Sequence, residues 1–127
     1  MKTNDIVAVY GSLRKGLGNH RLLSTSESLG THVVNIPFKM VSLGGFPALV
    51  PQDDSHEITV ELYTSDDPDV YSSLDMLEGY PSFYNRKKIA VDGKPAWVYF
   101  IESHEYVRGR DVVESGDWSN FVAGRYL

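Results

Sequence analysis

The chain has 127 residues, 42% of them hydrophobic and 23% charged, so we expect one globular domain spanning residues 1–127. It lacks cysteine, which excludes disulfides, thiolate metal sites and cysteine nucleophiles, and its net charge of -5 argues against general nucleic-acid binding. No segment resembles a membrane span or the apolar core of a signal peptide, so we expect a cytoplasmic protein without a membrane partner.

The first predicted element is a buried strand over residues 6–10, which ends abruptly at Gly11. A polar, glycine-containing loop follows over residues 11–16. Glycine permits positive φ and leaves room for a close approach, and successive N–H groups in such a turn can bind an anion. A tight turn without any ligand fits the same pattern. The loop matches neither a Walker phosphate loop nor a dinucleotide fingerprint.

The next segments read as short strands separated by turns. Asn19 is a candidate cap for a short helix over residues 20–23. An apolar strand is expected over residues 32–41, where Pro37 indicates an edge or a bend. A short strand over residues 48–50 should end before residues 51–54. Another follows over residues 57–63, whose alternation places Ile58, Val60 and Leu62 on one face and Thr59, Glu61 and Tyr63 on the other.

The clearest helix is expected over residues 68–77. Asp67 is a good N-cap, Pro68 suits the first helical position, and Gly79 is the expected C-terminal stop. Glu78 therefore falls at the helix end, where partial negative charge and apolar neighbours disfavour its ionised form. A raised pKa would suit a general base, although the spacing alone favours an ordinary surface glutamate in the last helical turn.

A hairpin is predicted from strands over residues 84–91 and 96–102, joined by Asp92-Gly93. Trp118 is expected to anchor the C-terminal segment in the core. Many short strands, one good helix and short connections predict an α+β domain with a curled or closed mixed sheet.

Other catalytic arrangements find little support in the chain. Its four histidines lack metal-ligand spacing, so no metal site is expected. Ser12 belongs to no recognisable triad, which argues against a serine hydrolase. Tyr84 stands out among the tyrosines because it lies close in sequence to Glu78.

Four short motifs occur in order along nearly the whole chain: VYGSLR at residues 9–14, ELY at 61–63, LDMLEGY at 74–80 and YNR at 84–86. Together they resemble the γ-glutamylcyclotransferase-like superfamily, and more narrowly its γ-glutamylamine cyclotransferase and AIG2-like branch. The resemblance implies a small mixed-sheet β-barrel with few helices and a cavity walled by the Tyr-Gly-Ser-Leu loop. It also implies conversion of a γ-glutamyl amine or amide to 5-oxoproline and a free amine, without a cofactor.

The resemblance assigns Glu78 as the catalytic acid and base. The backbone N–H groups of Gly11, Ser12 and Leu13 would hold the α-carboxylate of a small γ-glutamyl substrate. Tyr10 would line the pocket, and the Tyr84 hydroxyl would orient the reacting group.

One position departs from the family pattern, because Val60 stands where a glycine often precedes the Glu-Leu-Tyr motif. A branched side chain there could narrow the cavity. This motivates an alternative, a non-catalytic module that binds a small carboxylate on the same fold. A protein-interaction domain is a third reading, motivated only by the acidic composition.

Overall fold

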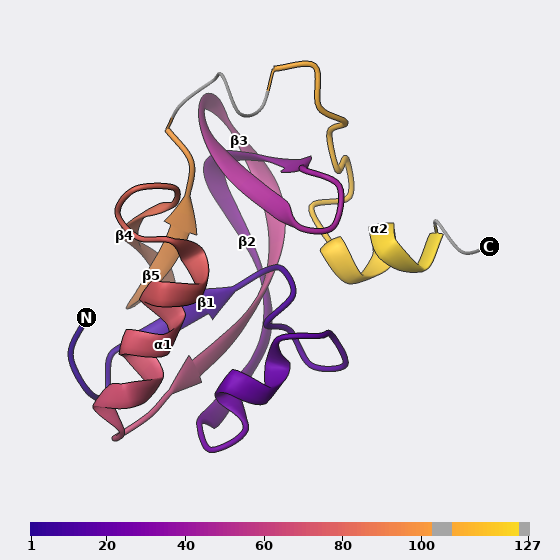
Figure 1. The fold of residues 1–127 in the computed structure, drawn as a ribbon. Helices are drawn as coiled ribbons and strands as arrows, with labels where there is room; N and C mark the ends of the chain where they lie inside the picture. Colours follow the sequence, from indigo (N-terminus) through magenta and orange to yellow (C-terminus); the bar gives the residue numbers. More distant parts are fainter. Residues whose placement is uncertain (103–107, 125–127) are drawn as a thin grey trace.

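The computed structural model describes residues 1–102 and 108–124, and its centre is a five-stranded mixed sheet with strand order β2-β3-β1-β5-β4 (Figure 1). Strand β1 pairs antiparallel with β3 and parallel with β5. The α+β class predicted from the sequence is confirmed. The elements are β1 (Ile6–Val9), the 3₁₀ helix η1 (His20–Leu23), β2 (Glu27–Ser42), β3 (Pro47–Thr64), α1 (Pro68–Glu78), β4 (Asn85–Val91), β5 (Lys94–Phe100) and α2 (Trp118–Gly124).

The sheet is curled without closing into the barrel that the resemblance implied. Strands β2 and β4 form its two edges and are not paired with each other. The edges nevertheless approach, because the Lys87 ammonium of β4 lies 4.9 Å from the ring centroid of Phe38 on β2. The curl encloses apolar side chains on the concave face without a continuous ring of hydrogen bonds.

The long β2–β3 hairpin corrects one prediction. Separate strands were expected over residues 48–50 and 57–63, but β3 runs continuously through both. The register shifts between Ile36 and Phe38, which face His56 and Pro51, so residues 52–55 bulge opposite Pro37. The bulge absorbs the polar segment that was expected to break the strand.

Local turn and cap signals were confirmed elsewhere. Asp67 accepts a hydrogen bond from the Asp69 N–H at 2.9 Å, and Gly79 ends α1 with a φ of 65°. Asp92 and Gly93 join β4 to β5 with φ values of 50° and 77°, as a tight hairpin turn requires. Asn19, in contrast, makes no side-chain cap on η1, so that expectation was wrong.

Apolar side chains pack on both faces of the sheet. Helix α1 covers one face through Val70, Tyr71 and Leu74, while α2 packs against the other through Trp118 (Figure 1). Trp118 is buried, as predicted. Since α1 lies against β1 and β5, its C-terminal end is held near the loop that leaves β1.

Candidate active site

A cavity of about 300 Å³ lies where the loop after β1, the end of α1 and the start of β3 meet. Every site residue predicted from the sequence contributes to its wall: Tyr10, Gly11, Ser12, Leu13, Glu78 and Tyr84. The fold thus brings together residues that are more than 60 positions apart in the chain. The remaining lining residues are Ala8, Val9, Asn19, Gly45, Phe46, Pro47, Leu77, Phe83 and Tyr99.

Glu78 supplies the only carboxylate in this wall among residues 1–102 and 108–124. It is the last residue of α1, and Gly79 turns the chain away immediately after it. Within the described part of the chain, no group donates a hydrogen bond to its carboxylate and no cation pairs with it. Burial therefore acts unopposed and raises the pKa of Glu78 from 4.5 to about 7. A carboxylate with this pKa can both accept and return a proton near neutral pH.

Two tyrosine hydroxyls beside Glu78 are already engaged with backbone groups. The Tyr84 hydroxyl donates to the Pro47 carbonyl at 2.6 Å. The Tyr10 hydroxyl donates to the Tyr99 carbonyl at 2.8 Å and accepts from the Leu49 N–H at 3.2 Å. Burial raises the pKa of both tyrosines, and the Glu78 charge adds to the effect. Both hydroxyls therefore stay protonated, and the lone pairs of Tyr84 remain able to accept a hydrogen bond.

Tyr99 completes the polar side of the cavity and was not singled out from the sequence. Its hydroxyl donates to Asp75 Oδ1 at 2.7 Å, and Asp75 also pairs with Arg86 at 2.9 Å. Burial and the Asp75 contact raise the pKa of Tyr99. The strand position of Tyr99 resembles that of any core aromatic, so only the contact between β5 and α1 reveals it.

The loop after β1 presents the backbone N–H groups of Gly11, Ser12 and Leu13. None of the three has a hydrogen-bond partner among the residues that the structure describes. The loop itself is held by other contacts: the Ser12 carbonyl accepts from the Asn19 N–H at 2.9 Å, and the Ser12 hydroxyl accepts from the Asn19 side chain at 2.8 Å. Three N–H groups without partners, held on a fixed loop, can donate hydrogen bonds to an anion without rearrangement.

Gly11 is required for space and not for a positive φ. Its backbone is not left-handed, but a Cβ built there would lie 3.0 Å from Cγ and Cδ of Pro47. The structure does not use the positive φ that glycine permits, and the close contact it shows is with Pro47. Close approach of a ligand to Gly11 stays a prediction. The loop lies directly against the proline whose carbonyl holds Tyr84.

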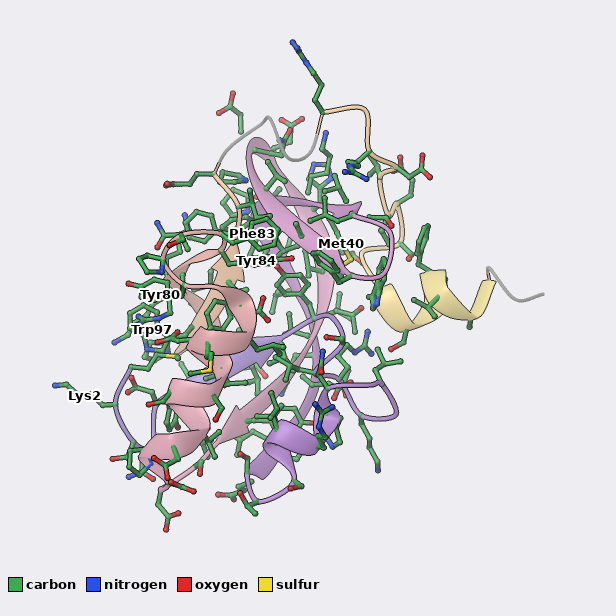
Figure 2. The ribbon with its side chains drawn as sticks, viewed as in Figure 1. Lys2, Met40, Tyr80, Phe83, Tyr84 and Trp97 are labelled. Atoms are coloured by element: carbon green, nitrogen blue, oxygen red, sulfur yellow. The ribbon has the colours of Figure 1, made fainter. Side chains whose placement is uncertain are left out.

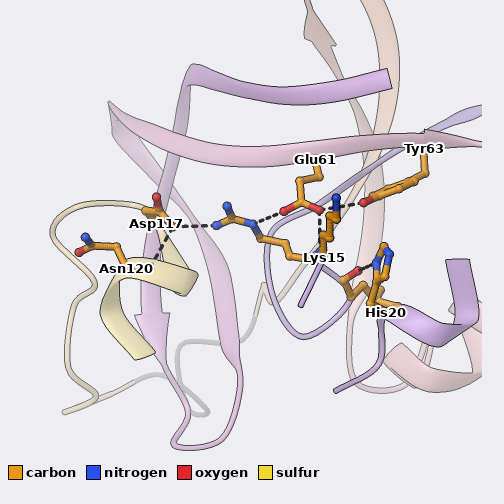
Figure 3. Close-up of polar contacts among 8 residues, drawn as sticks. Lys15, His20, Glu61, Tyr63, Asp117 and Asn120 are labelled. Atoms are coloured by element: carbon orange, nitrogen blue, oxygen red, sulfur yellow. Dashed lines mark hydrogen bonds and ion pairs between the residues drawn. The ribbon is translucent and has the colours of Figure 1, made fainter. Parts of the chain in front are cut away.

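Arg14, in the same loop, is the centre of a buried polar network that could not be predicted from the sequence (Figure 3). Its Nε donates to Glu61 Oε2 at 2.8 Å, and its Nη1 donates to Asp117 Oδ1 at 2.7 Å. Glu61 also accepts from the Lys15 N–H and the Tyr63 hydroxyl, each at 2.8 Å. The hydrogen bonds with Arg14, Lys15 and Tyr63 outweigh burial and lower the pKa of Glu61, which keeps it ionised. This network ties the loop to β3 and to the start of α2.

The mouth of the cavity is apolar. Phe46 and Leu77 are 40% and 41% exposed, although both line the cavity. Phe83 lies between Phe46 and Tyr84, with ring centroids 6.3 Å and 4.9 Å away. Figure 2 shows Phe83 and Tyr84 side by side near the end of α1. The contact between Phe46 and Phe83 could not be predicted from the sequence.

No group of three or more histidine, aspartate or glutamate side chains in residues 1–102 and 108–124 could hold a metal ion. No helix in the same ranges is long and apolar enough to cross a membrane.

Comparison with known proteins gives consistent matches. A family model described as "Gamma-glutamyl cyclotransferase, AIG2-like" matches residues 7–120. The "Putative gamma-glutamylcyclotransferase" of Vibrio cholerae is 35% identical over 118 residues, covering 92% of this chain and 97% of that protein. The solution structure of ytfP from Escherichia coli is 30% identical with a TM-score of 0.70, covering 92% and 98% of the two chains. An aig2-like protein from Mus musculus shares the fold at 24% identity, with a TM-score of 0.72 and coverage of 91% and 88%.

Proposed function

We propose that this enzyme, which belongs to the gamma-glutamyl cyclotransferase, AIG2-like family, cyclises a γ-glutamyl amine or amide. The products are 5-oxoproline and a free amine. Its membership of the family makes it an enzyme with γ-glutamylcyclotransferase-like activity. One observation carries the proposal. The half-buried carboxylate of Glu78, which has no partner among the described residues, lies in the same cavity wall as Gly11, Ser12 and Leu13, whose backbone N–H groups have no partner there either.

The reaction needs one proton acceptor that can also act as a donor. The neutral α-amine of the substrate attacks its own γ-carbonyl carbon, forming the ring C–N bond while Glu78 takes the amine proton. Collapse of the tetrahedral intermediate breaks the bond to the leaving nitrogen, and Glu78 returns the proton to that nitrogen. Bonds and protons balance within the substrate and Glu78, so we expect no cofactor. A positioned acid–base group of this kind contributes about 10²–10⁴-fold in rate.

The loop amides are proposed to hold the substrate α-carboxylate. Hydrogen bonds to a charged group contribute roughly 1.5–3 kcal/mol each, which is enough to keep the glutamyl chain folded toward ring closure. The N–H groups of Gly11, Ser12 and Leu13 have no competing partner in the described ranges. The unpaired amides and the Arg14 anchor support this role.

Tyr84 is proposed to orient the α-amine. Its proton is committed to the Pro47 carbonyl at 2.6 Å, so its oxygen can only accept from the substrate. An amine N–H is the matching donor. The Tyr10 hydroxyl donates one hydrogen bond to the backbone and accepts another from it, and its side chain lines the cavity.

The non-catalytic alternative loses the observation that motivated it. Val60 is fully buried in the core cluster that also contains Ala8 and Tyr10, and it does not itself line the cavity. Its branched side chain therefore does not narrow the cavity. The binding-module alternative would now be supported only by thermal stabilisation with glutamate-like ligands in the absence of turnover.

The proposed function is tested by incubating the protein with a panel of γ-glutamyl amines and dipeptides. We expect 5-oxoproline and the free amine to appear in equal amounts. Turnover removes the binding-module alternative, whereas ligand-induced stabilisation with no product from any substrate would favour it.

A further inference from the structure

The exposed part of the cavity wall consists of Gly45, Phe46 and Leu77, with Phe83 behind them. These residues come from the β2–β3 connection and from the region around the end of α1. Phe46 and Phe83 meet edge to face, with a ring-centroid distance of 6.3 Å and an interplanar angle of 82°. Apolar side chains that remain exposed at a cavity mouth often mark the place where a ligand binds.

Among the residues that the structure describes, Glu78 is the only one in this wall with a formal charge near neutral pH, and the proposed chemistry already uses it. No other charged side chain in residues 1–102 and 108–124 lines the wall to pair with a charged leaving amine. Arg14 and Arg86, the nearby cations, are paired with Glu61 and Asp75. A carboxylate or ammonium on the leaving group would therefore lose water at this mouth without gaining a partner.

The proposed chemistry fixes which end of the substrate reaches the mouth. The α-carboxylate lies at the amides of Gly11, Ser12 and Leu13, and the α-amine lies at Glu78. The substituent on the leaving nitrogen then extends toward the open side, where the product amine must depart.

We propose that the enzyme is selective for γ-glutamyl derivatives of uncharged, apolar amines, whose alkyl or aryl group packs against Phe46, Leu77 and Phe83. This inference rests on the proposed function. Burial of one methylene group corresponds to about fourfold in binding, so a benzyl group should gain tenfold or more over a methyl group. Phe46 and Leu77 are specificity-determining residues in this account, and neither takes part in the proton transfer.

The test measures kcat/KM for five substrates: the γ-glutamyl derivatives of methylamine, butylamine and benzylamine, γ-glutamylglycine, and γ-glutamyl-ε-lysine. We expect kcat/KM to rise from methyl to butyl to benzyl, by about tenfold or more in total. The glycine and lysine compounds, which carry charges on the leaving group, should not exceed the methylamide.

Two variants locate the preference on the structure. Phe46→Ser and Leu77→Ser should each reduce the benzyl-to-methyl ratio by about threefold or more, because each removes part of the apolar wall. Both side chains are partly exposed, so these variants should fold. The matched control is Val33→Ser, another exposed apolar residue at 62%, which lies on β2 outside the cavity. It should leave the ratio unchanged.

The outcomes separate the two proposals. If the methylamide is turned over but the benzyl-to-methyl ratio is one or lower, or the charged leaving groups are preferred, this inference is wrong and the proposed function stands. Equal loss of the ratio in Val33→Ser would also overturn the role of Phe46 and Leu77. If none of the five substrates yields 5-oxoproline, the proposed function fails and this inference fails with it.

Discussion

Arg14 Nε lies 2.8 Å from Glu61 Oε2, in a pair that is almost completely buried. Arg14 directly follows Gly11, Ser12 and Leu13 in the loop after β1, and Glu61 belongs to β3. The pair fixes the end of the loop to the sheet, so the geometry of the proposed carboxylate site depends on a residue that does not line the cavity.

Replacing Glu61 by glutamine should destabilise the protein by about 3 kcal/mol, because it leaves a buried guanidinium without its main counter-charge. The measurement is the free energy of unfolding in urea. Glu27→Gln makes the same chemical change at an exposed position and should cost less than about 0.5 kcal/mol. Equal effects of the two changes would show that the Arg14–Glu61 pair contributes no more to the free energy of unfolding than an exposed glutamate does.

Gly11→Ala should impair the site through Pro47. The added Cβ would stand 3.0 Å from Cγ and Cδ of the proline, whose carbonyl accepts from Tyr84. We expect a loss of about 1–2 kcal/mol in stability and a clear fall in kcat/KM. The control is Gly18→Ala, where a Cβ meets nothing within 4 Å and φ is not left-handed. A Gly11→Ala enzyme as active as the control would contradict the close-packing argument.

Tyr84→Phe should lower both stability and activity. The change removes the 2.6 Å bond to the Pro47 carbonyl and the oxygen proposed to accept from the substrate amine. A buried carbonyl left unpaired costs about 1–3 kcal/mol. Tyr80→Phe serves as control, since the Tyr80 ring contacts Arg86 through its face. Thermal unfolding and 5-oxoproline release are the readouts, and unchanged kcat/KM in Tyr84→Phe would remove its proposed role.

Stability should fall as pH rises through the range in which Glu78 ionises. Its pKa is 4.5 in the unfolded chain and about 7 in the folded protein. Between these values the folded state holds a proton that the unfolded state has lost, so stability declines from about pH 4.5 to 7 and then levels off. Glu78→Gln removes this cost and should stabilise the protein at pH 8 by up to about 3 kcal/mol.

The same substitution should have little effect on stability at pH 4, where both states of Glu78 are protonated. Denaturant unfolding at the two pH values, with Glu27→Gln as the exposed control, checks the difference. A gain at pH 8 no larger than the gain at pH 4 would mean that the Glu78 carboxylate is well solvated.

The sequence predicted best what depends on a few neighbouring residues. Asp67 and Gly79 bound α1 through local capping, and Asp92-Gly93 closes a hairpin through its own backbone conformation. Glu78 could be placed at a helix end for the same reason. Which groups contact the Glu78 carboxylate could not be predicted, because that depends on the other segments of the chain that pack around the helix end.

What the sequence missed depends on contacts between distant segments. The polar stretch at residues 52–55 looks like a turn, yet it becomes a bulge because β2 continues to pair on both sides of it. Arg14 looks like a solvated loop charge until β3 and α2 bring Glu61 and Asp117 to it. The apolar mouth likewise needs Phe46 and Phe83 to meet across 36 intervening positions.

Whether Glu78 transfers the proton in a cyclisation that yields 5-oxoproline is best measured as 5-oxoproline release by wild type and Glu78→Gln. Glutamine keeps the shape of the side chain but cannot act as the base. We expect product from the wild type and a fall of about 10²-fold or more in the variant, with folding retained. Equal rates in the two proteins would show that Glu78 does not transfer the proton.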